Sequence, residues 1–229
     1  MPTLLQRAFA EFVGTFVMVA CGCGAVAANA ETGALTHPGV ALTWGLVVLA
    51  LIYALGDLSG AHLNPAVTLG FVAAGRFPPK EAMAYVPAQL LGALVAAGFL
   101  RLVFPEDTLL GTTLPRGGDV WRSFALELFL TWFLMLAVLR VSTGAKEKGI
   151  TAGIAVGAII GLEAMFAGPL CGASMNPARS VGPAVVSGHL EHLWVYLAAP
   201  PLGAALAVVT DRFLSPPFVS PPRQQGASN

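Results

Sequence analysis

Two copies of one short motif, 112 positions apart, constrain the fold of this chain more than any other feature. Asn-Pro-Ala occurs at residues 64–66 and again at 176–178. Each copy predicts a helix start, because an Asn side chain accepts a hydrogen bond from a free N–H of the first turn and Pro fits the first helical position. The helices predicted from these starts, 64–75 and 176–187, would each be about 16 Å long. That is about half of the hydrocarbon thickness of a bilayer, so the two half-helices would together cross a membrane once.

The composition predicts an integral membrane protein. Charged residues make up 10% of the chain, where a soluble domain has about 25%, and the mean hydropathy is +0.75. The formal net charge is zero, so no nucleic-acid partner is expected. The first apolar stretch imitates a secretory signal, but Glu11 interrupts it, and we interpret it as a membrane helix. Six stretches are apolar and long enough to span a bilayer, namely 8–29, 39–57, 81–104, 122–141, 149–167 and 190–212.

The two halves of the chain repeat each other. The segment that starts at Glu11 matches one that starts at Glu127, at an offset of 116 residues. The segment that starts at Tyr85 matches one that starts at Tyr196, at an offset of 111 residues. Both offsets are close to that of the Asn-Pro-Ala motifs, so the whole chain is predicted to be a duplication.

Each repeat, about 8–104 and about 122–212, contains three full spans and one half-helix. Because three is an odd number, the second repeat must enter the membrane from the opposite face, as in inverted repeats whose broken helices meet at the midplane. The predicted fold class is therefore an all-α membrane protein with six transmembrane helices and two re-entrant half-helices. It forms a single domain over 1–214, and the Pro-rich tail, 215–229, is predicted to be disordered.

The distribution of Lys and Arg predicts the orientation. Cytoplasmic loops carry the excess of positive charge in membrane proteins, and placing both termini in the cytoplasm gives eight inner positions against three outer ones. The protein is thus expected in the plasma (cell inner) membrane, with the lipid bilayer around it. The inner positions are Arg7, Arg76, Lys80, Arg140, Lys146, Lys148, Arg212 and Arg223, and the outer ones are Arg101, Arg116 and Arg122.

The inverted repeat would bring the two half-helix starts, Asn64 and Asn176, together at mid-membrane. Irregular backbone at that depth is tolerated only where it is enclosed in protein or lines water. The approach segments, 59–63 and 171–175, are predicted to be extended, with carbonyl groups facing the enclosed water. Alternatively, the Asn-Pro pairs would only cap re-entrant helices. The residues expected to line the water are Gly60, Ala61, His62, Gly172 and Ser174, and His62 could instead serve in packing.

Three charged residues within the predicted spans and half-helices carry further hypotheses. Glu11 and Glu127 could be acid–base catalysts, but we favour a structural role in which each accepts backbone N–H bonds from the approach segment of its own repeat. Arg179 is expected to face water or partners, because an intramembrane charge is costly otherwise. The three cysteines and four histidines show no metal-ligand spacing. We expect no metal, no cofactor and no catalytic constellation, hence no enzyme.

The paired motifs, with Arg179 directly after Asn176-Pro177-Ala178 and Val67 directly after Asn64-Pro65-Ala66, resemble the aquaporin (major intrinsic protein) family. The resemblance extends from about residue 8 to about residue 212. It implies a passive channel for water and small uncharged solutes that excludes protons and ions. It also implies a homotetramer in which each chain encloses its own pore.

The resemblance also implies a narrow ring in this pore, formed by Trp44, Ala164, Ala173 and Arg179. Water-specific members of the family typically have His in the place of Ala164, so a wider ring is expected here. The run 167–175 resembles the nodulin-like branch of plants and its bacterial relatives. That branch passes glycerol, urea or neutral metalloid hydroxides as well as water.

Other residues keep alternatives open. Ser180, Ala184 and Tyr196 are similar to the residues of water channels, which leaves a water-selective channel with little solute flux as an alternative. A secondary transporter is a further alternative, since inverted repeats with broken helices also build those proteins. Such a transporter needs additional intramembrane charges, and the sequence has few. Glu163, next to Ala164, fits none of these patterns.

Overall fold

The computed structural model describes residues 2–142 and 146–214, and of residues 146–150 it describes the backbone alone. The six predicted spans are helices that are long and apolar enough to cross a bilayer, which confirms the fold class. The tail predicted to be disordered, 215–229, lies outside the described residues. The six long helices are α1 (Leu4–Thr32), α2 (Thr36–Ser59), α4 (Pro79–Val103), α5 (Val120–Val141), α6 (Lys146–Cys171) and α8 (Leu193–Leu214).

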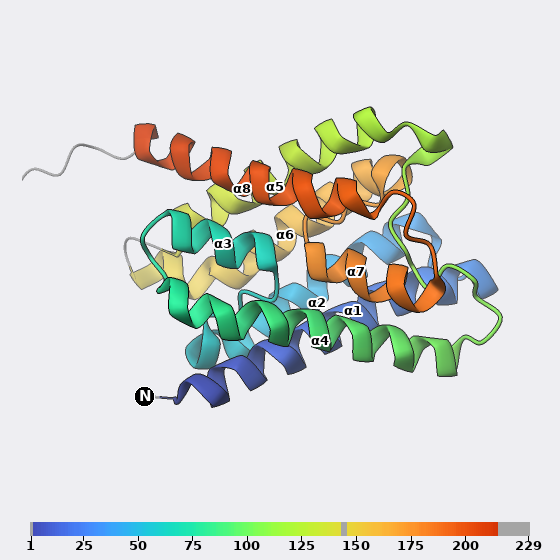
Figure 1. Cartoon of the computed structure of the whole chain (residues 1–229), viewed down its shortest axis with the longest axis horizontal. Coiled ribbons are helices and arrows are strands. Elements are labelled where there is room, and N and C mark those ends of the chain that lie inside the picture. Colours follow the sequence, from blue (N-terminus) through green and yellow to red (C-terminus); the bar gives the residue numbers. More distant parts are fainter. Residues whose placement is uncertain (1, 143–145, 215–229) are drawn as a thin grey trace, which may run out of the picture.

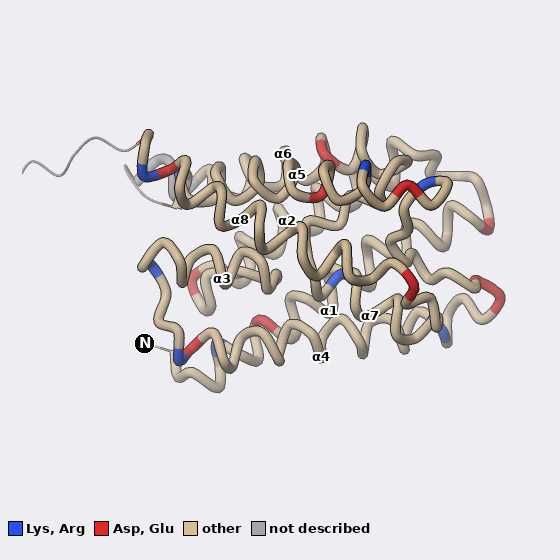
Figure 2. Tube along the Cα trace, turned by 45° about the horizontal axis from the view of Figure 1, so that its top comes forward, with Lys and Arg blue, Asp and Glu red and all other residues tan. Residues whose placement is uncertain are grey.

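The two half-helices are α3 (Pro65–Ala73) and α7 (Pro177–Ser187), and a single turn, η1 (Arg116–Gly118), interrupts the loop before α5. In Figure 1, α3 and α7 lie between α1 and α4 on one side and α5 and α8 on the other. The beginning of α8 and the end of α1 lie at one end of the molecule, and the two described chain ends lie at the other. Figure 2 shows that most charged residues lie toward these two ends and that a few lie between them.

The first half-helix is shorter than the sequence predicts. It contains 9 residues and ends at Ala73 instead of residue 75. Gly75 adopts a left-handed φ of 71°, and the Arg76 N–H donates back to the Phe71 carbonyl at 2.9 Å. This pattern is a common helix terminator, because glycine adopts the left-handed conformation without steric cost. α1 is longer than predicted, because Thr3 and Gln6 form a capping box before its first turn.

Matching glycines bring the backbones of neighbouring helices into contact. A Cβ at Gly92 of α4 would lie 2.4 Å from the carbonyl oxygen of Phe12 in α1. In the second repeat, a Cβ at Gly203 of α8 would lie 2.4 Å from the carbonyl oxygen of Leu128 in α5. Small residues at such crossings allow close van der Waals packing where no hydrophobic effect drives helix association. The duplication in the sequence is therefore also a duplication of packing.

The helices α2 and α6 form a third close crossing, in which a glycine of each helix faces the other. A Cβ at Gly45 would lie 2.6 Å from the Gly157 carbonyl oxygen, and one at Gly157 would lie 2.7 Å from the Gly45 carbonyl oxygen. This crossing links the two repeats, because α2 belongs to the first and α6 to the second.

An ion-pair network holds the C-terminal end of α3 in place. Arg76 donates from Nη2 to the carboxylate of Asp211 at 2.8 Å and from Nη1 to the carbonyl of Leu139 at 2.8 Å. Arg212 donates to the Ala73 carbonyl at 3.1 Å. The half-helix is thereby bound to α5 and α8 at the end of the molecule where α1 begins and α8 ends.

Candidate functional site

The two half-helices start as the motifs predict. The Asn64 Oδ1 accepts a hydrogen bond from the Ala66 N–H at 2.8 Å. The Asn176 Oδ1 accepts from the N–H groups of Ala178 and Arg179 at 3.0 and 3.3 Å. Pro65 and Pro177 occupy the first helical positions.

The two asparagines also bind each other's repeat. The Asn64 Nδ2 donates to the carbonyl of Met175 at 2.8 Å, and the Asn176 Nδ2 donates to the carbonyl of Leu63 at 2.8 Å. An amide nitrogen has two hydrogens. The second hydrogen of Asn64 has no partner among the described residues, that of Asn176 meets only a weak acceptor, the Met18 sulfur at 4.0 Å, and both side chains line one central cavity. The sequence motifs predict the caps but not these crossed bonds, which join residues more than 100 positions apart.

The approach segments are not extended as the sequence suggests. Alternate residues have left-handed backbone conformations, with φ of 48° at Ala61, 52° at Leu63, 41° at Ala173 and 54° at Met175. Such angles are uncommon for residues other than glycine, and they persist only where the surrounding structure enforces them. The same φ pattern in both segments shows that the repeat extends to single peptide groups.

Glu11 is an acceptor for the first approach segment. Its Oε1 accepts from the Ser59 hydroxyl at 2.7 Å and from the His62 N–H at 2.9 Å. Its Oε2 accepts from the Leu63 N–H at 2.6 Å and from the Gln89 side chain at 2.7 Å. This is the geometry of the structural role, and all of the carboxylate's described partners are donors within the protein.

Glu127 repeats this arrangement in the second half of the chain. It accepts from the N–H groups of Ser174 and Met175 at 2.8 and 2.7 Å. Pro200 stands where the repeat would place a counterpart of Gln89, and Pro offers no donor. The two carboxylates are thus alike in their backbone bonds and different in their side-chain support.

Two tyrosines that the sequence analysis used only as markers of the repeat hold the start of each approach segment. The Tyr85 hydroxyl donates to the Ser59 carbonyl at 2.8 Å, and the Tyr196 hydroxyl donates to the Cys171 carbonyl at 2.7 Å. Both tyrosines are fully buried. The matching sequence segments around them were the signal that could have identified this role.

All four residues of the expected ring line the central cavity. The guanidinium carbon of Arg179 lies 4.6 Å from the centroid of the Trp44 ring, within cation–π range. The Arg179 Nη1 donates to the carbonyl of Gly111 at 2.8 Å. Ala164 and Ala173 contribute only methyl groups to the ring. Arg179 therefore meets the two conditions expected of an intramembrane arginine, a partner and a cavity.

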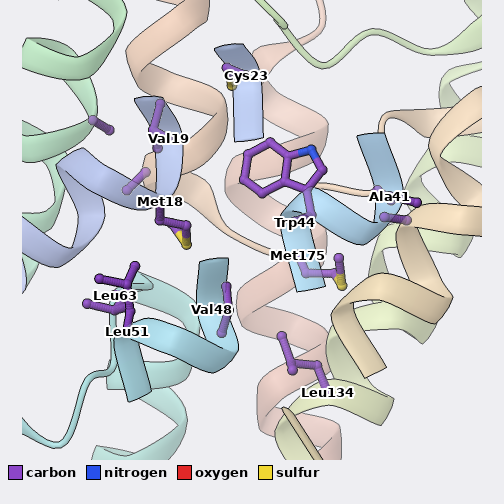
Figure 3. Close-up of a cluster of buried hydrophobic side chains, with 14 of the residues drawn as sticks. Met18, Val19, Cys23, Ala41, Trp44, Val48, Leu51, Leu63, Leu134 and Met175 are labelled. Atoms are coloured by element: carbon purple, nitrogen blue, oxygen red, sulfur yellow. The ribbon is translucent and has the colours of Figure 1, made fainter. Parts of the chain in front are cut away.

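Trp44 fits its place because α1 leaves room for it. A Cβ at Gly22 would lie 2.4 Å from the indole of Trp44. Figure 3 shows this indole near Val19 and Cys23 of α1 and Met175 of the second approach segment. The side chain is 9% exposed, so its position is fixed by packing on most sides.

The central cavity measures about 130 Å³ and reaches from the ring to Val141 and Ser142 near the opposite end of the molecule. One water needs about 10–15 Å³ when volume is measured in this way, so the cavity can hold several. The asparagines and the approach segments line it together with apolar side chains of the long helices. The latter include Met18, Val48, Ile52, Leu134, Val156 and Ile160, which the sequence analysis did not identify.

Of the two glycines, the alanine and the serine also expected to line the cavity, three do so and one does not. Gly60, Ala61 and Ser174 line the cavity, but Gly172 is not among its lining residues. A Cβ at Gly172 would lie 2.9 Å from the side chain of Thr113, so this glycine faces the loop between α4 and α5 and not the cavity. The prediction for Gly172 is therefore corrected.

His62 both lines the cavity and packs. It is among the lining residues, and its ring stacks on that of Phe71 with a centroid distance of 4.7 Å. It meets the edge of Phe77 at 4.7 Å, and its Nδ1 lies 3.1 Å from the Thr68 hydroxyl. Its orientation is fixed by these contacts, so the two roles considered for His62 coexist.

Glu163 is the buried charged residue that the site does not use. Its side chain is fully buried, and neither carboxylate oxygen has a hydrogen-bond partner among the described residues. It follows Leu162, precedes Ala164, and is not a lining residue of the cavity. Among residues 2–142 and 146–214, no group of three or more His, Cys, Asp or Glu side chains could hold a metal ion.

Comparisons with known proteins agree with this geometry. The family model described as Major intrinsic protein matches residues 1–210. The chain is 48% identical to aquaporin NIP1-1 of Zea mays over 219 residues, which cover 93% of this chain and 77% of that protein. It is 44% identical to aquaporin NIP1-2 of Arabidopsis thaliana, with coverage of 87% and 71%.

A solved structure shares the fold. The X-ray structure of the aquaglyceroporin from Plasmodium falciparum matches with a TM-score of 0.84 and 29% identity, over 93% of this chain and 97% of that chain. The two half-helices, the six spans and these relatives lead to one conclusion. The chain belongs to the major intrinsic protein (aquaporin) family, in its nodulin-like branch, whose members are membrane channels and not enzymes.

Proposed function

We propose that this channel conducts water and small uncharged solutes larger than water, such as glycerol, urea and neutral metalloid hydroxides, and excludes protons and ions. The observation that supports this solute range is the composition of the ring. Ala164 and Ala173 end in methyl groups, and both line the cavity together with Trp44 and Arg179. A solute with a carbon skeleton can pack on the methyl groups and the indole, while its hydroxyl groups accept from the guanidinium.

The same residues oppose the passage of ions. Arg179 carries a positive charge at the ring, and the starts of α3 and α7 each contribute about half an elementary positive charge from the helix dipole. The second N–H of Asn64 and that of Asn176 donate to a passing water at the point where the half-helices meet. A water oriented by two donors is poorly placed to relay a proton, and the positive potential repels cations.

A water-selective channel with little solute flux is the second candidate. It is favoured by the 4.6 Å approach of the Arg179 guanidinium to Trp44, since two ring members in contact narrow the opening. A secondary transporter is less well supported, because it needs carboxylates that can bind a coupling ion. Glu11 and Glu127 already accept backbone N–H bonds and are fully buried. Glu163, whose carboxylate has no partner among the described residues, does not line the cavity.

We further propose a homotetramer in the plasma membrane with both termini in the cytoplasm. The two described chain ends lie at the same end of the molecule, which agrees with an even number of crossings (Figure 1). On the outer surface, α2 and α6 form an apolar groove lined by Leu42, Gly45, Leu46, Gly157 and Leu162, among others. A groove lined by small and apolar residues suits helix packing between subunits.

Stopped-flow light scattering of proteoliposomes tests the solute range. Vesicles with the wild-type channel should take up water, glycerol and urea faster than empty vesicles, and radiolabelled arsenite influx should rise in parallel. Ala164→Trp is the matched control, because the indole fills the ring and should abolish all of these fluxes. Fast water flux with glycerol, urea and arsenite rates equal to those of empty vesicles would establish the water-selective alternative instead.

A further inference from the structure

Pro169 removes a backbone donor from α6 close to the ring. In a regular helix, the carbonyl of Met165 accepts from the N–H of residue 169, but Pro has no N–H. Met165 directly follows the ring residue Ala164. In a membrane, a carbonyl without its helical donor requires another one, because no bulk water is present to supply it.

His37 supplies a donor from another helix. Its Nε2 lies 2.7 Å from the carbonyl oxygen of Met165, across 128 positions of sequence. A carbonyl oxygen only accepts, so the Nε2 must carry a hydrogen, whether the ring is neutral or charged. His37 lies in the first turn of α2, and the bond therefore joins the beginning of α2 to the last turns of α6.

Gly168 makes this approach possible. A Cβ at this position would lie 3.1 Å from the Cε1 of His37, a tight contact that would require the imidazole to shift by a few tenths of an ångström. The proline, the glycine and the histidine thus form one local arrangement, which we name the His37 clasp. It consists of His37, Met165, Gly168 and Pro169.

The clasp acts on the two helices that carry opposite sides of the ring. Trp44 lies two turns after His37 on α2, and Ala164 directly precedes the clasped carbonyl on α6. The glycine crossing at Gly45 and Gly157 fixes the separation of these helices at one level. The clasp provides a second attachment, and two attachments also fix the angle between the helices.

The clasp joins the two repeats, and the proline that makes it necessary occurs in the second repeat only. At the offset of 112 residues, Asp57 takes the place of Pro169 in the first repeat, and Asp57 has a backbone N–H. The need for the clasp is therefore specific to the half of the chain that contributes Ala164, Ala173 and Arg179 to the ring.

We propose that His37 is a positioning residue that sets the solute size limit of this channel by holding α6, and with it Ala164, toward Trp44. The inference rests on the proposed function. Without the clasp, the missing helical bond to the Met165 carbonyl leaves the segment 164–169 of α6 free to bend away from α2, since helices bend where a proline interrupts their hydrogen bonds. The ring then widens, although His37 itself is not one of its members.

The test compares four channels in proteoliposomes by their ratio of glycerol to water permeability. His37→Ala removes the donor and should raise the ratio roughly threefold or more. His37→Gln keeps an N–H donor and should retain the wild-type ratio. The double variant His37→Ala with Pro169→Ala should also return to the wild-type ratio, because residue 169 then donates its own N–H to Met165.

His189→Ala is the matched control, because His189 interacts with Glu191 outside the ring, and it should leave the ratio unchanged. An unchanged ratio in His37→Ala, or a raised ratio that persists in the double variant, overturns the inference. Circular dichroism shows whether each variant retains its helices. If vesicles with the wild-type channel pass water but no larger solute, the proposed function is wrong, and this outcome is independent of the clasp. The clasp is then judged by water flux, where equal rates for His37→Ala and wild type overturn it.

Discussion

Gly92 of α4 lies directly against the carbonyl of Phe12 in α1, so that a Cβ at this glycine would come within 2.4 Å of the carbonyl oxygen. The carbonyl belongs to the helix backbone and cannot move without the helix. One turn before Gly92, the Gln89 side chain donates to Glu11 at 2.7 Å. The close approach of α1 and α4 thus places the donor and the acceptor that support the first approach segment.

Gly92→Ala should destabilise the protein for this reason. Overpacking of a tight contact costs roughly 1–3 kcal/mol, so the thermal midpoint in detergent should fall. Gly98→Ala on the same helix is the matched control, because nothing lies within 4 Å of a Cβ built there. Removing a glycine from an open helical position should leave stability equal or raise it. Equal thermal midpoints for Gly92→Ala and Gly98→Ala would show that α1 and α4 can move apart at little cost in free energy.

Glu163→Leu should stabilise the protein, although it replaces a charged residue. Both carboxylate oxygens are buried without a partner among the described residues, and such groups cost free energy in the folded state. The equivalent position of the first repeat, Leu51, already carries this side chain in a buried site. The thermal midpoint should rise, and water flux should remain.

Glu127→Leu is the contrasting variant. It removes the acceptor of two buried N–H groups, those of Ser174 and Met175, at roughly 1–3 kcal/mol for each unsatisfied group. The thermal midpoint should fall. The second approach segment should no longer hold Asn176 in its place at the cavity, so water flux should be lost. A Glu163→Leu midpoint as low as that of Glu127→Leu would mean that Glu163 has a structural role that its contacts do not reveal.

Asn64→Asp separates the two functions of the motif asparagine. The carboxylate can still accept from the Ala66 N–H and cap α3, but it cannot donate to the Met175 carbonyl. The loss of this bond between the repeats should lower stability by roughly 1–3 kcal/mol. The negative charge should also raise the proton permeability of proteoliposomes, measured with a trapped pH dye. A stable variant that remains tight to protons would show that the donor on Asn64 is dispensable.

Ala164→His tests the register of the ring. The imidazole adds bulk and polarity where the cavity wall now ends in a methyl group, so glycerol flux should fall by roughly tenfold while water flux persists. Leu102→Ala is the control, since its side chain is exposed on the surface of α4, away from the cavity and from the groove between α2 and α6. An unaltered ratio of glycerol to water in Ala164→His would place Ala164 outside the constriction.

Local signals in the sequence predicted the elements of the fold, and contacts between distant segments account for what they missed. The Asn-Pro pairs indicated both half-helix starts, because caps depend on residues within one turn. Gly75 could have indicated the earlier end of α3, since glycine in a left-handed conformation commonly terminates a helix. The span boundaries also depend on residues that are close in the sequence, and the bounds of the six long helices are therefore predicted to within a few residues. The largest differences are at α1 and α6, each of which extends four residues beyond one end of the prediction.

The crossed asparagine bonds and the His37 clasp were not predictable in this way. Each joins atoms more than 100 positions apart, and their partners are backbone carbonyls, which every residue has. Gly172 was misplaced for a similar reason, because only the packed loop at Thr113 determines which way it faces. The ring is predictable from the family resemblance, but the cation–π contact of Arg179 with Trp44 is not, because it depends on how α2 and α7 pack around the cavity.

The crossed bonds impose an order on how the protein is made. The side-chain amide of Asn64 can bind the Met175 carbonyl only after the ribosome has added Met175, 111 residues later. Until then, the first re-entrant loop sits in the bilayer with its bonds between the repeats unmade. The two motifs can therefore join only after the second loop has entered the membrane, and a nascent chain that ends before this loop contains only one of the two asparagines.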